Sequence, residues 1–538
     1  MSLFSLDRVR IARQGACTLL LALLVGAPTA VLAQEMDGTG VVATGLLLRQ
    51  MDGVKRVLMI AAHPDDEDTS LLTTLSRGWG AETAYLALTR GDGGQNLIGP
   101  ELWEGLGIVR TGELVAAREL DGGRQFFTRA FDYGFSKSAE EALSLWPREE
   151  LLEDVVWAVR TFRPHVIVSV FSGTPSDGHG QHQAAGIMAR EAYAAAGDPT
   201  RFPDQLGQGV EAWTPSKIYQ SSRRRFVSGD ADNDDGSVDV QTGTLDPLLG
   251  RSLLQLSMES RSQHRSQDMG AAQPAGPRTT GVILVDSRVD SGAGIFSGID
   301  TTLVGLTGAL PAGAASEARR HLTAYREAVA RATADFGMDP QRIAPHLLEA
   351  AAHLSAAQSA EGATDREFRA ALATKAVVVE RAILAATGIS FDVRASDDLL
   401  VPGQTVEVNA QLWNGGSQRL SLPEVGLRTP SGWTVVETGV EGLTADGTVE
   451  PGALVTWTYD VTLPAAAELS RLYYLREARD GARYRWPDEP ELRGSPGNPP
   501  LVDGTVRFAF LTDQARAMRT ATTAWRYVSV DPAFGEFE

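Results

Sequence analysis

The chain has 538 residues, which is too long for one ordinary hydrophobic core and predicts two to four domains. Its 68 acidic and 49 basic side chains leave a formal charge of −19 at pH 7, which disfavours nucleic acid as a partner because a polyanion would be repelled. Hydrophobic residues make up 43% of the chain, a share typical of globular rather than disordered proteins.

The N-terminus has the pattern of a secretory signal. Three arginines within the first 13 residues precede an apolar segment, and small residues follow at Val31 and Ala33. We therefore predict a signal peptide over residues 1–33, cleaved near Ala33, and export to the periplasm or the extracellular space. The only cysteine, Cys17, lies in this segment, so the mature chain would contain no disulfide. No other stretch is long and apolar enough to span a membrane.

Residues 50–300 alternate strand-like and helix-like segments. The strands are apolar throughout, as a parallel sheet covered on both faces requires, and the alternation predicts a Rossmann-like, mostly parallel α/β domain. The expected strands are 54–62, 82–89, 124–131, 165–171 and 217–222, and the expected helices are 68–79, 111–120, 149–161 and 182–195. The polar segment 220–239 is interpreted as an insertion or an edge loop.

Three further regions follow. Residues 313–387 are rich in alanine with helical periodicity and predict a helical connector that ends at Gly388. Residues 389–465 alternate apolar and polar side chains between turn signals, which predicts an immunoglobulin-like β-module. Residues 466–538 are expected to be a β-rich segment that is incomplete, with strand candidates LYYLRE and GTVRFAF.

Histidines and acidic residues follow two of the expected strands. AHPDDE comes directly after the first strand, and HGQH follows the strand that ends at Phe171. In open α/β sheets the carboxyl ends of the strands meet at one binding crevice, so the two loops should converge there. A zinc site with an open position takes three protein ligands from His and Asp or Glu. Each loop alone could be a solvated turn, but together they predict a metal site.

These two motifs resemble those of the PIG-L/LmbE-like N-acetylglucosaminyl deacetylases, which are zinc hydrolases with a Rossmann-like fold. The resemblance covers roughly residues 54–300 and includes the stretches TRGDGGQN, RTGE and HRSQ. Many relatives have a Pro-Asp pair where this chain has Gly180 and Gln181 between the histidines. That departure bears on loop rigidity and substrate preference more than on metal binding.

The resemblance implies a role for each matching residue. The zinc ligands would be His63, Asp66 and His182, with Fe²⁺ or another divalent ion as the alternative metal. Asp65 would be the general base, and a positively charged His179 would face the developing oxyanion and later protonate the departing amine. An arginine at the start of the helix after the second strand and an aspartate beyond the third hold sugar hydroxyls in relatives, and these positions are Arg110 and Asp132 here.

The sequence therefore predicts an exported zinc-dependent hydrolase that removes the N-acetyl group from an N-acetylglucosamine-type sugar or glycoconjugate. Two alternatives stay open. One is a metal-dependent amidase that acts on another acylated amine, and the other is a non-catalytic glycan-binding surface protein. The intact Asp65 argues against a pure binding protein, because such a protein needs no general base beside its metal.

Overall fold

The apolar run RVLMIA forms β1 (Arg56–Ala61), which is buried along its whole length at the centre of a seven-stranded sheet. The computed structural model describes residues 38–222, 237–511, 518–531 and 535–537, so the predicted signal peptide at 1–33 lies outside the described residues. Among the described helices, none is both long enough and apolar enough to cross a membrane.

The sheet has the order β3-β2-β1-β4-β5-β9-β6. The first five strands pair in parallel, and the last two add an antiparallel edge. Its other strands are β2 (Glu82–Ala87), β3 (Arg124–Phe127), β4 (Val166–Ser169), β5 (Lys217–Ser221), β6 (Ser237–Gln241) and β9 (Thr279–Ser287). The predicted mostly parallel α/β sheet is therefore confirmed, while residues 237–241 form a strand where an insertion or edge loop was expected.

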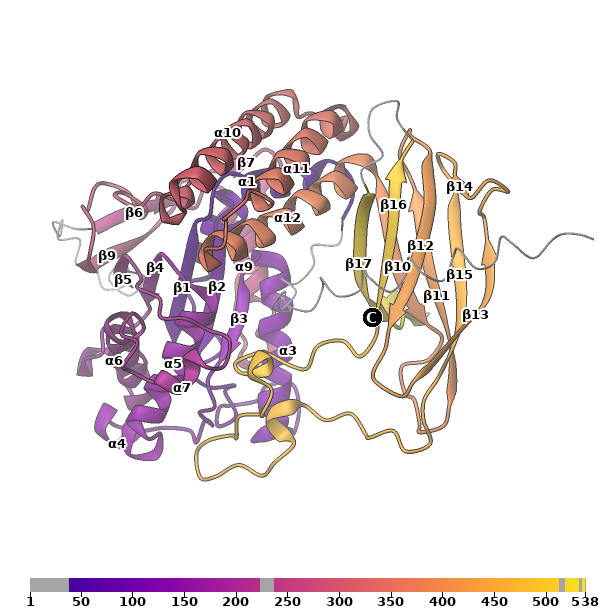
Figure 1. The fold of residues 1–538 in the computed structure, drawn as a ribbon. Coiled ribbons are helices and arrows are strands. Elements are labelled where there is room, and N and C mark those ends of the chain that lie inside the picture. Colours follow the sequence, from indigo (N-terminus) through magenta and orange to yellow (C-terminus); the bar gives the residue numbers. More distant parts are fainter. Residues whose placement is uncertain (1–37, 223–236, 512–517, 532–534, 538) are drawn as a thin grey trace, which may run out of the picture.

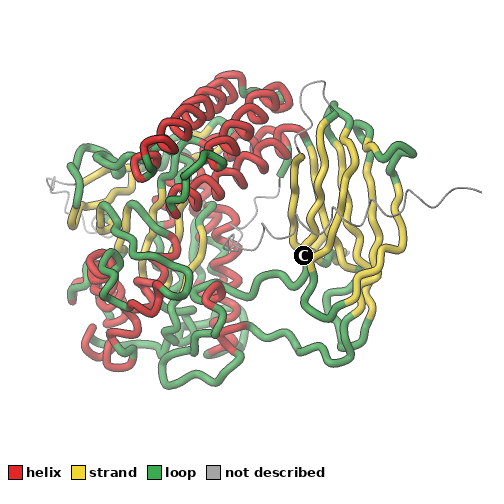
Figure 2. Tube along the Cα trace, in the orientation of Figure 1, coloured by secondary structure: helices red, strands yellow, loops and turns green. Residues whose placement is uncertain are grey.

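Helices surround this sheet, as a strand buried on both faces requires (Figure 2). They are α2 (Thr69–Thr73), α3 (Glu104–Asp121), α4 (Ala139–Leu145), α5 (Arg148–Phe162), α6 (Gly180–Ala195), α7 (Pro203–Leu206) and α9 (Leu253–Arg261). The helix predicted over 68–79 is an α-helical turn that continues into a π-helical turn at Thr74–Gly78. Two short strands, β7 (Leu245–Asp246) and β8 (Arg251–Ser252), precede α9.

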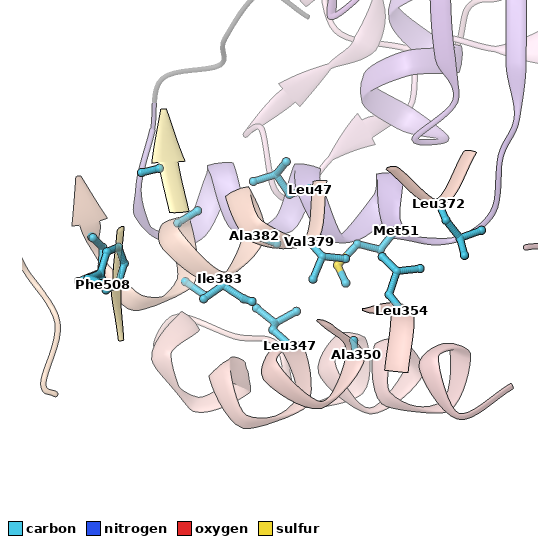
Figure 3. Packing of buried hydrophobic residues seen from close by; sticks show 14 of the residues in the cluster. Leu47, Met51, Leu347, Ala350, Leu354, Leu372, Val379, Ala382, Ile383 and Phe508 are labelled. Carbon is cyan, nitrogen blue, oxygen red and sulfur yellow. The ribbon is translucent and has the colours of Figure 1, made fainter. Parts of the chain in front are cut away.

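Three helices occupy the region where a helical connector was expected: α10 (Ala312–Asp335), α11 (Ala344–Gln358) and α12 (Arg366–Thr387). Gly388 follows α12 with a φ of +70°, a conformation that glycine adopts without strain. An additional helix, α1 (Gly40–Met51), lies against α12 and was not predicted. Leu47 and Met51 of α1 pack with Leu347 and Val379 in one apolar core (Figure 3).

The C-terminal region is rich in strands, which pair in the order β13-β15-β11-β10-β17-β16-β12-β14. They are β10 (Ile389–Ala395), β11 (Thr405–Asn414), β12 (Leu420–Arg428), β13 (Thr434–Glu441), β14 (Thr448–Val449), β15 (Leu454–Thr462), β16 (Asp503–Phe510) and β17 (Met518–Arg526). A separate small pair consists of β18 (Ser529–Asp531) and β19 (Gly535–Phe537). The sheet thus extends past the expected boundary at residue 465, because β16 and β17 pair within it.

Between β15 and β16 the chain leaves this sheet and runs along the α/β domain beside α3 and β3 (Figure 1). We call residues 472–498 the strap. LYYLRE, expected to be a strand, lies at its start and contains the 3₁₀ turn Tyr473–Leu475 instead. The expectation failed because these aromatic side chains pack against the other domain rather than in a sheet.

Candidate metal centre

The loop after β1 brings a carboxylate between two histidines. One oxygen of Asp66 lies 3.2 Å from Nδ1 of His63, and the other lies 3.2 Å from Nε2 of His182. The backbone N–H of His63 also donates to the Asp66 carboxylate at 2.8 Å. Two motifs more than one hundred residues apart in the sequence therefore meet at the carboxyl end of the parallel strands, as the topology predicts.

The loop after β4 supplies the other two histidines. His179 is the residue immediately before α6, and His182 lies in the first turn of that helix. The His182 ring stacks on Phe171 at a centroid distance of 4.0 Å, and its Nδ1 lies 3.1 Å from the carbonyl oxygen of Asp177. That carbonyl can only accept, so Nδ1 carries a proton, and Nε2, which lies beside Asp66, is the nitrogen that would bind a metal.

The side chains of the first loop have strongly shifted pKa values. Burial alone would raise the pKa of Asp66, but the charge and hydrogen bond of His182 and the bond to His63 hold it well below its usual range. Burial alone would lower the pKa of His63, but its hydrogen bond to Asp66 and the nearby carboxylates raise it to about 9. Burial, and then the charge of Asp66, raise the pKa of Asp65 to about 6.

His179 lies against both other histidines of the site. Burial, and then the charges of His182 and His63, lower its pKa to about 4, which opposes the positive charge that the resemblance implies for this ring. Its Nδ1 lies 2.8 Å from the amide oxygen of Gln181, which also accepts from the hydroxyl of Ser136. Gln181 thus stands beside His179 where many relatives have the aspartate of the Pro-Asp pair.

Asp65 has an unusual backbone, with a φ of +98°. Few residues other than glycine adopt such a φ, and strain of this kind gathers at functional sites. Its N–H donates to the Glu67 carboxylate at 3.0 Å, and its carbonyl accepts from Arg261 at 2.9 Å. The carbonyl of Pro64 accepts from Gln267 at 3.0 Å. The surrounding structure therefore holds this backbone in place from both sides.

Glu67, the last residue of the AHPDDE motif, is fully buried within a network of charged side chains. Its Oε1 accepts from Arg118 at 3.0 Å and lies 2.9 Å from Nε2 of His264. Arg118 also pairs with Asp121 at 2.7 Å. Arg118 and Asp121 lie three residues apart on α3, but nothing in the sequence pairs them with Glu67 or His264.

The two expected sugar-binding residues lie at the same site. An oxygen of Asp132 is 4.0 Å from Nε2 of His63, and Asp132 Oδ1 accepts from the N–H of Gly134 at 2.9 Å. Arg110 is buried on α3 and donates to the carbonyl of Gln95 at 2.7 Å. Burial lowers the pKa of Arg110, and the charges of Asp65 and Asp132 oppose this effect.

The donors fit a divalent ion. Ligand atoms of His63, His179 and His182 all lie within 4.8 Å of one another, and the Asp66 carboxylate lies between His63 and His182. Two sets of three ligands are therefore available, which differ in whether Asp66 or His179 is the third. Imidazole nitrogen and carboxylate oxygen are ligands that Zn²⁺ and Fe²⁺ both accept.

Comparison with known proteins assigns two parts of the chain. Residues 58–193 match the GlcNAc-PI de-N-acetylase (PIG-L) family, and residues 400–478 match the NPCBM-associated, NEW3 domain of alpha-galactosidase. The first segment contains every motif residue discussed above from His63 to His182.

Two curated relatives are named 1D-myo-inositol 2-acetamido-2-deoxy-alpha-D-glucopyranoside deacetylase. The protein from Kineococcus radiotolerans is 28% identical over 275 residues, which cover 44% of this chain and 76% of the relative. The protein from Geodermatophilus obscurus is 33% identical over 183 residues, which cover 31% of this chain and 60% of the relative.

Among solved structures, the N,N'-diacetylchitobiose deacetylase from Pyrococcus horikoshii matches with a TM-score of 0.29 and 21% identity. That match covers 40% of this chain and 70% of the other. The motifs, the sheet that positions them and the sequence relatives lead to the same assignment. Residues 58–193 of this chain form a PIG-L domain of the de-N-acetylase family.

Proposed function

We propose that this chain is a metal-dependent N-deacetylase that removes the acetyl group from an N-acetylglucosamine-type sugar or glycoconjugate. The observation that carries the proposal is the Asp66 carboxylate set between His63 and His182, with Asp65 directly before it in the chain. Relatives named as deacetylases of an acetamido sugar support the choice of bond and substrate.

His63, Asp66 and His182 would hold the metal, which we propose is Zn²⁺ with Fe²⁺ as the alternative. We prefer Asp66 to His179 as the third ligand because its two oxygens contact both other ligands, and because His179 is then left to handle a proton. A bound divalent ion would supply Lewis acidity to the attack of water on the amide carbon.

Asp65 and His179 would handle the protons. A carboxylate with a pKa of about 6 is ionised at neutral pH and basic enough to accept a proton from the attacking water. The Nδ1–H of His179 donates to an amide oxygen, which leaves Nε2 able to take up a proton and return it. When the carbon–nitrogen bond breaks, the proton goes to the amine, so acetate and a free amino sugar are released.

Arg110 and Asp132 would bind the sugar. Asp132 lies next to His63 and can accept from a hydroxyl group, while the guanidinium of Arg110 can donate to another. Both side chains are almost fully buried, which means that a polar group of the substrate would replace little water on contacting them.

Two finer assignments belong to the same proposal. The N-terminal pattern supports export to the periplasm or the extracellular space, where a glycoconjugate is a plausible substrate. The strand-rich region from β10 onward would serve as an immunoglobulin-like accessory module, and its match to a domain of alpha-galactosidase supports a role beside sugar chemistry.

The test combines metal analysis with acetate release. Purified wild-type chain should carry about one equivalent of metal and release acetate from N-acetylglucosamine oligomers. Asp65→Asn should keep the metal and lose activity by about 100-fold or more, as expected when a general base is removed. His182→Ala should lose both. The control is Asp204→Asn, which makes the same change at an exposed position of α7, outside both motifs.

Other outcomes would select the alternatives. Acetate release from a different acylated amine, with none from sugars, would identify an amidase of another specificity. Metal and glycan binding without hydrolysis of any amide in a panel would identify a binding protein. Absence of metal and of hydrolysis together would overturn the proposal.

A further inference from the structure

The strap is joined to the α/β domain by backbone hydrogen bonds. The N–H of Phe131 donates to the carbonyl of Ala482 at 2.9 Å, and the N–H of Tyr484 donates to the carbonyl of Arg129 at 2.6 Å. An antiparallel bridge between residues 130 and 483 lies between these two bonds. The strap therefore pairs with the chain that follows β3, on the way from this edge strand to the candidate site.

The strap also surrounds a buried cation. Arg90, which is 1% exposed, donates to the carbonyls of Ser495 and Pro496 at 3.0 and 2.8 Å. Its guanidinium lies 3.5 Å from the ring centroid of Tyr474 and 4.2 Å from that of Phe127. A guanidinium without these partners would be costly to bury, so the α/β domain depends on the strap at this point.

From the strap, a chain of contacts leads to the site. The hydroxyl of Tyr484 donates to Oδ1 of Asp92, and Oδ2 of Asp92 accepts from the backbone N–H of Asp132 at 3.3 Å. Asp132 in turn lies 4.0 Å from Nε2 of His63. Tyr484, Asp92 and Asp132 are each 3% exposed or less. Burial raises the pKa of Asp92 to about 7, a sign of how little solvent reaches it.

We propose that Tyr484 is a positioning residue of the candidate active site, and that it acts through Asp92 to hold Asp132 in place for substrate. The strap, which lies between β15 and β16 in the chain, then contributes a positioning residue to the catalytic domain. This inference rests on the proposed function for its effect on catalysis, but the physical link from Tyr484 to Asp132 can be tested without any activity.

The alternative is that the strap only stabilises the fold, and a matched pair of variants separates the two readings. Tyr484→Phe removes the hydroxyl bond to Asp92. Trp486→Phe removes a second strap bond of the same kind, in which the indole N–H donates to the buried carboxylate of Asp154 at 2.7 Å. Asp154 keeps its bonds to Arg129, so this control leaves no unpaired charge.

Both variants are made in the full chain and compared for metal content, thermal stability, kinetics of acetate release and hydrogen–deuterium exchange. Tyr484→Phe should lower kcat/KM by about 10-fold, mainly through KM, with the metal retained, because Asp132 contacts substrate rather than metal. It should also speed exchange in residues 128–138. Trp486→Phe should change kcat/KM by no more than about 2-fold, even if it lowers thermal stability as much as Tyr484→Phe does.

The double variant Asp92→Asn with Tyr484→Phe should be no worse than Asp92→Asn alone, since both act along one line of contacts. Equal kinetics and equal exchange in Tyr484→Phe and Trp486→Phe would overturn the inference. If the wild type releases no acetate, the proposed function fails, and exchange in residues 128–138 still decides whether Tyr484 orders Asp132.

Discussion

At the scale of single residues, the candidate base is held by one contact from within its own motif and one from a distant helix. Asp65 has a positive φ, and a non-glycine residue in that region persists only where its neighbours fix it. The Glu67 carboxylate accepts a hydrogen bond from the N–H of Asp65. Arg261, the last residue of α9 and almost two hundred residues away in the sequence, donates to the carbonyl of Asp65. The third acidic residue of the motif therefore supports the backbone of Asp65, and the part played by α9 could be seen only in the structure.

Removing the Arg261 contact should misplace the base without removing the metal. Arg261→Met keeps the apolar stem of the side chain but loses the hydrogen bond to Asp65, so we expect kcat to fall by roughly 10-fold with metal content unchanged. Arg265→Met, the same change at an exposed position on the following turn, is the control and should leave kcat unaltered. If Arg261→Met and Arg265→Met have the same kcat, the contact does not position the base.

At the scale of elements, the two ends of the parallel strands have different roles. The carboxyl ends of β1 and β4 carry the metal-site loops, while His165 lies directly before β4 at the opposite end. His165 packs edge-on against Trp213 at a centroid distance of 6.0 Å, and its Nδ1 has no hydrogen-bond partner among the described residues. His165 is therefore a packed residue at the end of the strand.

The buried His165 should make stability depend on pH. Burial, and then the charge of Arg56, lower its pKa to about 3 from a usual value near 6.5, so the folded chain holds this ring neutral. Between these pH values the unfolded chain binds a proton on His165 that the folded chain does not bind. The full free energy of unfolding is therefore kept above about pH 6.5, and part of it is lost as pH falls towards 3. Relative to His165→Leu, the wild type should lose roughly 2 kcal/mol between pH 7 and pH 5.

Denaturation by urea at pH 7 and pH 5 measures this difference, and only the change between the two pH values is compared. Any effect of leucine on packing cancels in that comparison. The same pH dependence in both proteins would show that His165 is not held neutral.

The elements also show which parts of the site were predictable. His63, Asp66 and His182 could be brought together from sequence, because each follows an apolar strand and parallel strands end at one edge. Tyr484 could not, because 392 residues separate it from Asp92 and no spacing rule links them. The lowered pKa of His179 could not be predicted either, since it depends on burial and on the charges of His182 and His63.

At the scale of the whole molecule, the residues that the structure describes form two large apolar cores rather than one per predicted region. One core lies within the seven-stranded sheet and its helices and includes Leu152 of α5. The other is shared by α1, the helices α10–α12 and the strand-rich region, so that Leu347 and Phe508 belong to a single cluster (Figure 3). Helical periodicity could locate the helices, but not the fact that they and the sheet bury one common surface.

This division predicts which parts of the chain lose stability together. Leu347→Ala opens a cavity in the shared core, and such changes lower the free energy of unfolding by about 2–5 kcal/mol. Because the core is shared, the change should destabilise the strand-rich region as well as the helices. Leu152→Ala makes the same change in the other core and is the matched control. Hydrogen–deuterium exchange resolved by peptide measures both responses in the full chain.

Leu347→Ala should speed exchange in α11, α12 and β11 and leave β1 and β4 protected, because no apolar side chain of those two strands belongs to the shared core. Leu152→Ala should produce the reverse pattern. Faster exchange in α11 with β11 unchanged would show that the connector and the sheet are separate units. Equal loss of protection throughout the chain in both variants would show a single cooperative unit, with the strap transmitting the loss between the two cores.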